Sequence, residues 1–189
     1  MAPKLKTHHI EIAAGRSRAA MSFLAQLDDQ SRRLLADLRG TTPVELQWQP
    51  KRGANTMGML LAHLAIVEVY WLQVATGRVS DAGIRKVLGI EGDDDGLPLA
   101  PAALPPAALH GRTLAFYQKL LAKARACTKR NLRDWTDADL ERFVTRTRRT
   151  GEVSRQSLRW ILYHVLEHEA GHYGQVLLLR HLYRDRRRK

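Results

Sequence analysis

Apolar residues recur every three or four positions in four long segments of this chain, and this spacing constrains the fold more than any other feature. Such a repeat gathers apolar side chains on one side of an α-helix. The four predicted helices span residues 16–39, 55–77, 104–132 and 154–183. Strand-like alternation is weak throughout. Four amphipathic helices with long connections therefore predict an all-α, four-helix bundle.

The segments between the helices carry the residues that interrupt regular structure. Residues 40–54 contain two glycines and two prolines, and either Asn55 or Thr56 is suited to cap the helix that follows. Residues 92–112 combine three consecutive aspartates with four prolines, which predicts a long irregular connection. Residues 134–153 predict an irregular stretch or a short hairpin, with Asp134 or Thr136 capping a brief turn.

Length and composition fit one ordinary domain. A chain of 189 residues with 44% apolar and 26% charged residues is expected to form a single domain over residues 1–189. Its bundle core is expected at about 16–183, between a short N-terminal tail and a basic C-terminal tail. The single cysteine, Cys127, excludes an intrachain disulfide and suits a reducing compartment. With neither a signal-like segment nor an apolar run of spanning length, a cytoplasmic protein without a membrane partner is expected.

The formal net charge of +12 raises the question of a nucleic-acid partner. Much of the excess is local, in residues 142–149 and in the terminal segment 180–189. Basic loops and tails of this kind are more typical of solvated ends than of recognition surfaces. The charge pattern therefore argues against nucleic acid as the main partner.

Three histidines follow one another at four-residue spacing in the last predicted helix: His164, His168 and His172. At 100° per residue, His168 and His172 lie in the middle of the apolar stripe, and His164 lies nearer its edge. The second helix repeats the pattern, because His63 lies within its apolar stripe. Facing helices of a bundle build metal sites in this way, and three imidazoles leave a coordination position open, as in catalytic zinc sites.

Each of these histidines also has a simpler interpretation. A lone histidine on an apolar face is more often a hydrogen-bonded core residue than a ligand, and the pair His168 and His172 alone does not separate the two. The addition of His63 from a separate stripe is what favours a shared metal ion. His164 is expected to fill space or to bond a neighbour rather than to bind the ion.

Polar residues near the predicted ligands are candidates for supporting roles. Glu169 lies at the edge of the stripe, where it either orients a ligand or acts as a base, or instead marks a helix or subunit boundary. Gln175, one turn beyond the last of the three histidines, is expected to bond another helix or a ligand. Glu68 lies about 140° around the helix from His63. That angle favours a surface salt bridge or a link between helices.

Gly171 and Gly174 interrupt the last helix, each at a cost of about 1 kcal/mol relative to alanine. Close approach of another helix or of a second subunit is the expected explanation. Trp48, in the loop before the second helix, is a candidate for the mouth of a pocket. No nucleophile elbow, phosphate-binding loop or dinucleotide fingerprint is present, so no catalytic residue is assigned beyond the metal ligands.

Two segments resemble the motifs of the DinB/YfiT-like family of metal-dependent four-helix-bundle proteins. The family's closing motif, in which histidine, three residues and histidine precede glycine and glutamine, is matched within LRWILYHVLEHEAGHYGQVLLL. Its other hallmark, a histidine in an apolar helix with glutamate five positions later, is matched within GANTMGMLLAHLAIVEVYWL. The preceding TPVELQWQPKRGAN is similar to the family's lead-in, and the resemblance spans residues 16–183.

The resemblance implies a bundle that binds one divalent metal ion per chain, commonly zinc or nickel, through His63, His168 and His172. Family members commonly form homodimers. Some transfer low-molecular-weight thiols such as bacillithiol or mycothiol to electrophiles, and others isomerise thiol adducts. Tyr173 departs from the arginine that the family frequently has between the last histidine and glycine, which argues against an anion-holding role at that position.

Two functions are consistent with these observations. The first is a metal-dependent enzyme that acts on a small-molecule substrate at a three-histidine site, by hydrolysis or by thiol transfer to an electrophile. In the second of these reactions, a low-molecular-weight thiol is the co-substrate. The alternative is a non-catalytic module, either a metal-stabilised dimeric bundle or a basic nucleic-acid-associated protein. Metal content tests the ligand assignment, and salt-dependent nucleic-acid binding is the measurement that would favour the second function.

Overall fold

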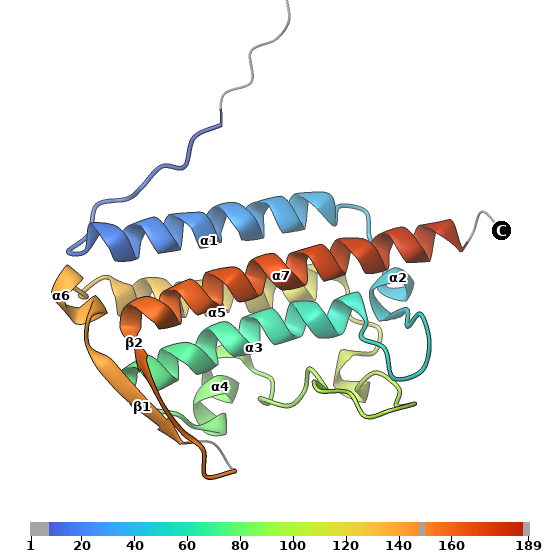
Figure 1. Ribbon diagram of the computed structural model, residues 1–189. Helices are drawn as coiled ribbons and strands as arrows, with labels where there is room; N and C mark the ends of the chain where they lie inside the picture. Colours follow the sequence, from blue (N-terminus) through green and yellow to red (C-terminus); the bar gives the residue numbers. More distant parts are fainter. Residues whose placement is uncertain (1–7, 148–149, 187–189) are drawn as a thin grey trace, which may run out of the picture.

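The computed structural model describes residues 8–147 and 150–186, and four long helices lie side by side in it (Figure 1). They are α1 (Arg18–Asp37), α3 (Met57–Thr76), α5 (Leu114–Leu132) and α7 (Leu158–Asp185). Helix α3 packs against both α5 and α7, and α1 closes the bundle against the same two helices. The predicted, mostly α-helical bundle is confirmed.

Side-chain caps set where three of the four long helices begin. The hydroxyl oxygens of Ser17, Thr56 and Ser157 each accept a hydrogen bond from the backbone N–H three residues further on, at 2.9, 3.1 and 3.1 Å. Of the two caps predicted for the second long helix, Thr56 is therefore the one used. Helix α3 ends at Thr76 and is capped by Gly77, whose φ of 68° suits a residue without a Cβ atom.

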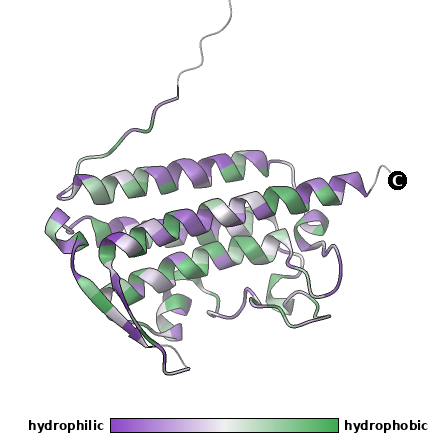
Figure 2. Ribbon diagram, in the orientation of Figure 1, coloured by the Kyte–Doolittle hydropathy of each residue, from purple (hydrophilic) through white to green (hydrophobic). Residues whose placement is uncertain are grey.

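Helix α3 is the apolar centre of the bundle. Most of its residues are buried, and hydrophobic colour covers much of it in Figure 2, in contrast to the more hydrophilic α1. By length and composition Met57–Thr76 is able to cross a membrane, but 83% of its apolar window is buried, as in the core helix of a soluble protein. Polar residues of α3 are therefore held inside the protein or at the edge of its core.

The connections contain more structure than the sequence predicts. Short helices α2 (Pro43–Gln47), α4 (Asp81–Leu88) and α6 (Asp137–Leu140) lie outside the four predicted helices, and α6 is capped by Thr136. The predicted start of the third long helix near residue 104 is wrong. That stretch forms only the 3-10 turn η1 (Ala107–Leu109), and α5 begins at Leu114. Two consecutive prolines and Gly111, with a φ of 68°, interrupt the helix there.

The stretch after α6 is a short hairpin, one of the two forms that the sequence predicts. Strands β1 (Phe143–Thr147) and β2 (Val153–Ser157) pair antiparallel, with Arg146 opposite Ser154. Because β2 continues to Ser157, helix α7 begins at Leu158 rather than near Ser154, and it ends at Asp185.

A buried ionic cluster ties α5 to its neighbours. Arg125 Nε donates a hydrogen bond to Glu68 on α3 at 2.9 Å, and Arg125 Nη2 donates to Glu169 on α7 at 3.1 Å. The hydroxyl of Thr128 also donates to Glu68. All four side chains are buried. Glu68 is therefore a link between helices, which was one of its two predicted roles.

Candidate metal centre

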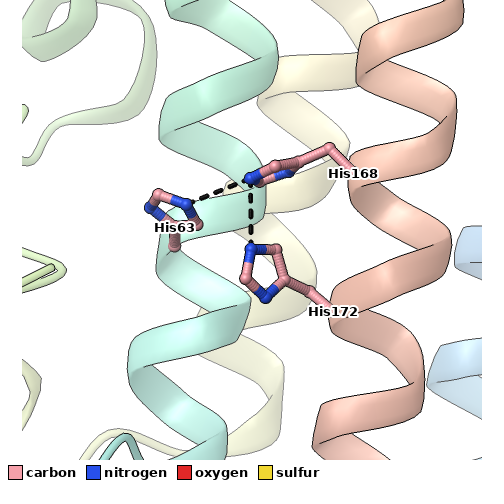
Figure 3. Close-up of side chains that lie close together, drawn as sticks. All are labelled: His63, His168 and His172. Carbon is pink, nitrogen blue, oxygen red and sulfur yellow. Dashed lines mark hydrogen bonds between the residues drawn. The ribbon is translucent and has the colours of Figure 1, made fainter. Parts of the chain in front are cut away.

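Three histidine side chains meet between α3 and α7. His63 extends from α3, and His168 and His172 extend from α7 one turn apart (Figure 3). Nε2 of His168 lies 3.1 Å from Nε2 of His63 and 3.1 Å from Nε2 of His172. One ligand atom from each of the three lies within 4.8 Å of the others. The structure thus brings together the three residues that the sequence predicts as metal ligands.

Hydrogen bonds on the outer side of two rings fix which nitrogen faces the centre. Nδ1 of His63 donates to Asp95 Oδ2 at 2.7 Å, and Nδ1 of His172 donates to Gln175 Oε1 at 2.9 Å. A neutral imidazole carries one N–H, so Nε2 of each ring presents a lone pair to the centre. Metal-binding histidines usually have such an outer partner.

The surroundings favour neutral imidazole rings. Burial, assisted by the neighbouring His172, His63 and His164, lowers the pKa of His168 to about 3. Burial also lowers the pKa of His172, against the opposing effect of its hydrogen bond to Gln175. Neutral imidazole is the form that binds metal ions, so at neutral pH neither ring would have to release a proton before it could act as a ligand.

A divalent cation fits this donor set. Two nitrogens bound to one zinc ion at 2.0–2.1 Å in tetrahedral directions lie about 3.3 Å apart, which is close to the two separations of 3.1 Å at His168. Hydrogen bonds alone satisfy the cluster poorly, because one proton on Nε2 of His168 cannot serve the lone pairs of both neighbouring rings at once. Three protein ligands also leave a coordination position for a further ligand.

The weaker candidates from the sequence have different fates. His164 stays outside the cluster: its ring stacks on Trp160 and meets Trp71 edge-on, with centroids 4.8 and 4.9 Å apart, which agrees with a space-filling residue. Gln175 supports the centre through its bond to His172. Glu169 is directed to Arg125, so it lies at a helix boundary and does not orient a histidine.

Two further expectations need correction. Trp48 packs edge-on against Tyr183, with ring centroids 5.7 Å apart, and does not line the cleft beside His63. A Cβ atom added at Gly171 or Gly174 would have no neighbour within 4 Å. Close approach of another helix of the same chain therefore does not explain the two glycines, and contact with a second subunit stays a prediction.

Asp95 is the candidate that the sequence reasoning missed. It belongs to the run of three aspartates interpreted as part of an irregular connection, yet its side chain is buried against His63. Its other carboxylate oxygen accepts a hydrogen bond from the backbone N–H of Leu97 at 3.0 Å. The available signal was chemical: a histidine ligand needs an acceptor for its second nitrogen, and this aspartate run had no assigned role.

A cleft of about 410 Å³ opens beside His63. Helix α3 supplies one wall, and α4 with the loop 91–97 supplies the other. Apolar side chains and carboxylates line it together: Ile66, Val67, Tyr70, Ile84 and Leu97 with Asp81, Glu91, Asp93 and Asp95. The cleft is large enough to hold a small organic molecule next to the histidine cluster.

Comparison with known proteins places the chain in a family. A model of the mycothiol-S-transferase family matches residues 22–185, a segment that contains the three clustered histidines and nearly all of the four-helix bundle. A search of curated proteins gave no match. Since the family match covers far more than half of the chain, the chain belongs to the mycothiol-S-transferase family, which is part of the DinB/YfiT-like superfamily.

Proposed function

We propose that this protein is a metal-dependent transferase that joins the sulfur atom of a low-molecular-weight thiol to an electrophilic carbon of a second small molecule. Mycothiol is the thiol that the family description names. The observation that carries the proposal is the convergence of Nε2 atoms from His63, His168 and His172 beside a cleft. One divalent ion per chain, zinc or nickel, is the proposed occupant, and both metals suit imidazole ligands.

The proposed reaction is a substitution at carbon. The thiol loses its proton to solvent, the thiolate forms a carbon–sulfur bond, and the leaving group departs with the electron pair of the bond that breaks. A free thiol with a pKa of about 8.5 is mostly protonated at neutral pH. A divalent cation, when bound, supplies the Lewis acidity that lowers the pKa of a coordinated thiol. The reducing cytoplasm, in which thiols stay free, is the proposed compartment.

The chain's own residues prepare this site. Asp95 and Gln175 hold two of the rings so that their lone pairs point to one place. The low pKa of His168 keeps the third ring unprotonated at neutral pH. The cleft along α3 gives a substrate access to the edge of the cluster. Binding, orientation and an unprotonated donor set are thus contributions that the protein makes before any substrate arrives.

Elemental analysis and thiol consumption test the proposal together. Purified protein should contain about one divalent ion per chain, and it should accelerate the loss of free mycothiol in the presence of an alkylating electrophile. His168→Gln should lose both properties, because Nε2 of His168 is the atom closest to both other rings.

His181→Gln is the matched control. His181 is exposed on the same helix and is not part of the cluster, so this variant should keep its metal and its activity. Full metal occupancy in His168→Gln would contradict the ligand assignment. Metal-loaded wild-type protein that leaves the thiol unconsumed would contradict the transferase reaction.

A further inference from the structure

The cleft beside His63 differs in charge from the rest of the chain. The chain has 31 lysines and arginines against 19 aspartates and glutamates. Among the described residues that line the cleft, four are aspartate or glutamate and none is lysine or arginine. A concave surface with charges of one sign concentrates ligands of the opposite charge. The cleft therefore attracts cations and repels anions, although the protein as a whole is strongly basic.

Two of the four carboxylates have partners within the chain. Asp95 accepts hydrogen bonds from His63 and from the backbone N–H of Leu97, at 2.7 and 3.0 Å. Glu91 pairs with Arg85 at 3.1 Å. Contacts that hold the cleft wall in place thus account for both of these residues.

The other two carboxylates, Asp81 and Asp93, are open to a ligand. Both residues are exposed, and within residues 8–147 and 150–186 neither carboxylate takes part in a hydrogen bond or an ion pair. A Cβ atom added at Gly92 would lie 3.4 Å from Asp81 Oδ1 and 3.2 Å from Ile84 Cδ1. The lack of a side chain at Gly92 thus lets the first turn of α4 approach the loop that carries Asp93. Asp81 also favours the helix dipole of α4, but that interaction leaves its oxygens free to accept hydrogen bonds.

Apolar side chains make up most of the remaining lining. Ile66 and Val67 belong to α3, and Ile84 belongs to α4 on the other wall. Tyr70 also lines the cleft, and Arg146 stacks on its ring with the guanidinium carbon 5.2 Å from the centroid, but Arg146 itself is not a lining residue. A ligand that fills the cleft therefore needs an apolar body as well as a charge.

We propose that the electrophile of this protein is an amphipathic organic cation, with Asp81 and Asp93 as its specificity-determining residues. The positive group binds the two carboxylates, and the apolar body packs between Ile66 and Ile84, next to the histidine cluster. The identification of this ligand as the electrophile rests on the proposed function. Ammonium, guanidinium and amidinium groups all provide the required charge, and the planar amidinium matches the two oxygens of a carboxylate.

Calorimetric titration with an unreactive ligand pair tests the cleft without turnover. The pair is 2-naphthamidine, which is a cation at neutral pH, and 2-naphthamide, its neutral isostere. The protonated amidinium group has no free nitrogen lone pair, so it does not bind by coordination to a metal ion. An exposed ion pair changes an equilibrium by up to about fivefold. With two carboxylates, wild-type protein should therefore bind the amidine about tenfold more tightly than the amide.

Substitution of the carboxylates assigns this preference to the cleft. Asp81→Asn and Asp93→Asn should each lower the preference about threefold, and the double variant should abolish it. Asp134→Asn is the matched control, because Asp134 is exposed, pairs with Arg133 at 3.5 Å and does not line the cleft. The same change in net charge should there leave the preference intact.

Asp93→Asn alone decides if the variants at the start of α4 fail to fold, because no contact among the described residues depends on the Asp93 carboxylate. Equal affinities of wild-type protein for the two ligands would overturn the proposal. An unchanged preference in Asp93→Asn would do the same.

Mycothiol is the competing occupant of the cleft, because its hydroxyl groups also donate hydrogen bonds to carboxylates. Titration of the amidine in the presence of saturating mycothiol separates the two ligands. An unchanged dissociation constant for the amidine would support its assignment as the second substrate. A competitive increase would assign the cleft to the thiol and overturn the proposal.

A kinetic arm separates this inference from the transferase assignment. The 6-bromomethyl derivatives of both ligands are allowed to react with a fixed concentration of mycothiol. The sulfur–carbon bond forms, bromide leaves with the electron pair of the carbon–bromine bond, and the thiol proton passes to solvent. Wild-type protein should show a KM about tenfold lower for the amidine, and the double variant should remove this difference. A binding preference without turnover would contradict the proposed function and support the cation site, whereas turnover without a preference would do the reverse.

Discussion

At the scale of single residues, Asp95 is the support on which the position of His63 depends. Its carboxylate accepts the Nδ1 proton of His63 and is itself buried. Asp95→Asn removes the negative charge that makes the imidazole a stronger donor to a metal, and loss of such outer partners typically weakens metal affinity about 10–100-fold. Competition against a chromophoric chelator at fixed pH measures the zinc dissociation constant.

Asp93→Asn provides the comparison for this measurement. Asp93 precedes Asp95 by two residues, is exposed and also lines the cleft, so its variant carries the same change in net charge. Its zinc affinity should match that of wild-type protein. Equal zinc affinities for wild-type protein and both variants would show that the hydrogen bond from His63 to Asp95 does not strengthen zinc binding.

The difference between the histidines and Asp95 shows what the sequence contains at this scale. Helical spacing alone put His63, His168 and His172 on apolar stripes, because a helix fixes the direction of every side chain. Asp95 lies in a connection, where no such period applies, and its contact with His63 depends on how α4 and the loop 91–97 return to α3. Sequence periodicity therefore predicts candidate ligands on helices but not the residues on loops that bond to them.

At the scale of helices, the buried cluster around Arg125 holds α5 against α3 and α7. Arg125→Met would leave Glu68 and Glu169 buried without their cation. Removing one partner of a buried ion pair costs about 3–5 kcal/mol. We therefore expect the free energy of unfolding, measured with urea at pH 8, to fall by this amount. Lys129→Met removes a cation from the same helix that is half exposed and paired with Asp28, and it should cost below about 1 kcal/mol.

The pH dependence of the Arg125 variant gives a second check. Burial already raises the pKa of Glu169 to about 7 in the presence of Arg125. A carboxyl group with a raised pKa keeps its proton in the folded state after the unfolded chain has lost it, so stability falls as the pH rises through this window. Arg125 lowers the pKa of Glu169, so without Arg125 this pKa is higher and the pH range in which only the folded chain holds the proton is wider. The decrease in the free energy of unfolding caused by Arg125→Met should therefore be smaller at pH 5 than at pH 8. An equal decrease at both pH values would contradict this account.

Prediction of the elements was strongest where apolar spacing runs for many turns. All four long helices were predicted for this reason, and α7 was misplaced at its start only by the length of β2. The short elements contain too few repeats of the apolar spacing to be recognised. The start of α5 was predicted too early, because apolar spacing alone takes no account of the prolines before Leu114. Arg146 was accordingly interpreted as part of a basic loop, although the hairpin turns it toward the aromatic surface of α3.

At the scale of the whole molecule, part of the positive charge is used inside the protein. In the terminal segment, Arg180 pairs with Glu45 at 3.3 Å and donates to the backbone carbonyl of Arg39 at 2.9 Å. Arg186 stacks on Tyr183 with its guanidinium carbon 3.6 Å from the ring centroid. Residues 148–149 and 187–189 of the two basic segments lie outside the described residues. The described arginines of the tail hold the end of α7 against α2, which weakens the case for a basic arm that binds nucleic acid.

The outward side of α7 is the surface at which we predict a second copy of the chain. Trp160, Leu178 and Leu182 are 40%, 57% and 43% exposed there, and at 100° per residue they share one side with the two glycines of the helix. The open space above Gly171 and Gly174 admits the side chains of a partner helix. Because α7 also carries two of the clustered histidines, the predicted dimer would place the two metal centres along one shared helix pair.

Sedimentation equilibrium tests this arrangement. Wild-type protein should be a dimer, and Leu178→Glu should shift it to a monomer, because a carboxylate in an apolar interface loses its hydration without gaining a partner. Leu104→Glu places the same charge on a residue that is 60% exposed in the connection before α5, so that protein should remain a dimer. If the wild-type protein is a monomer, contact with a second subunit does not explain the two glycines. If Leu178→Glu is still a dimer, the interface lies on another face of the bundle.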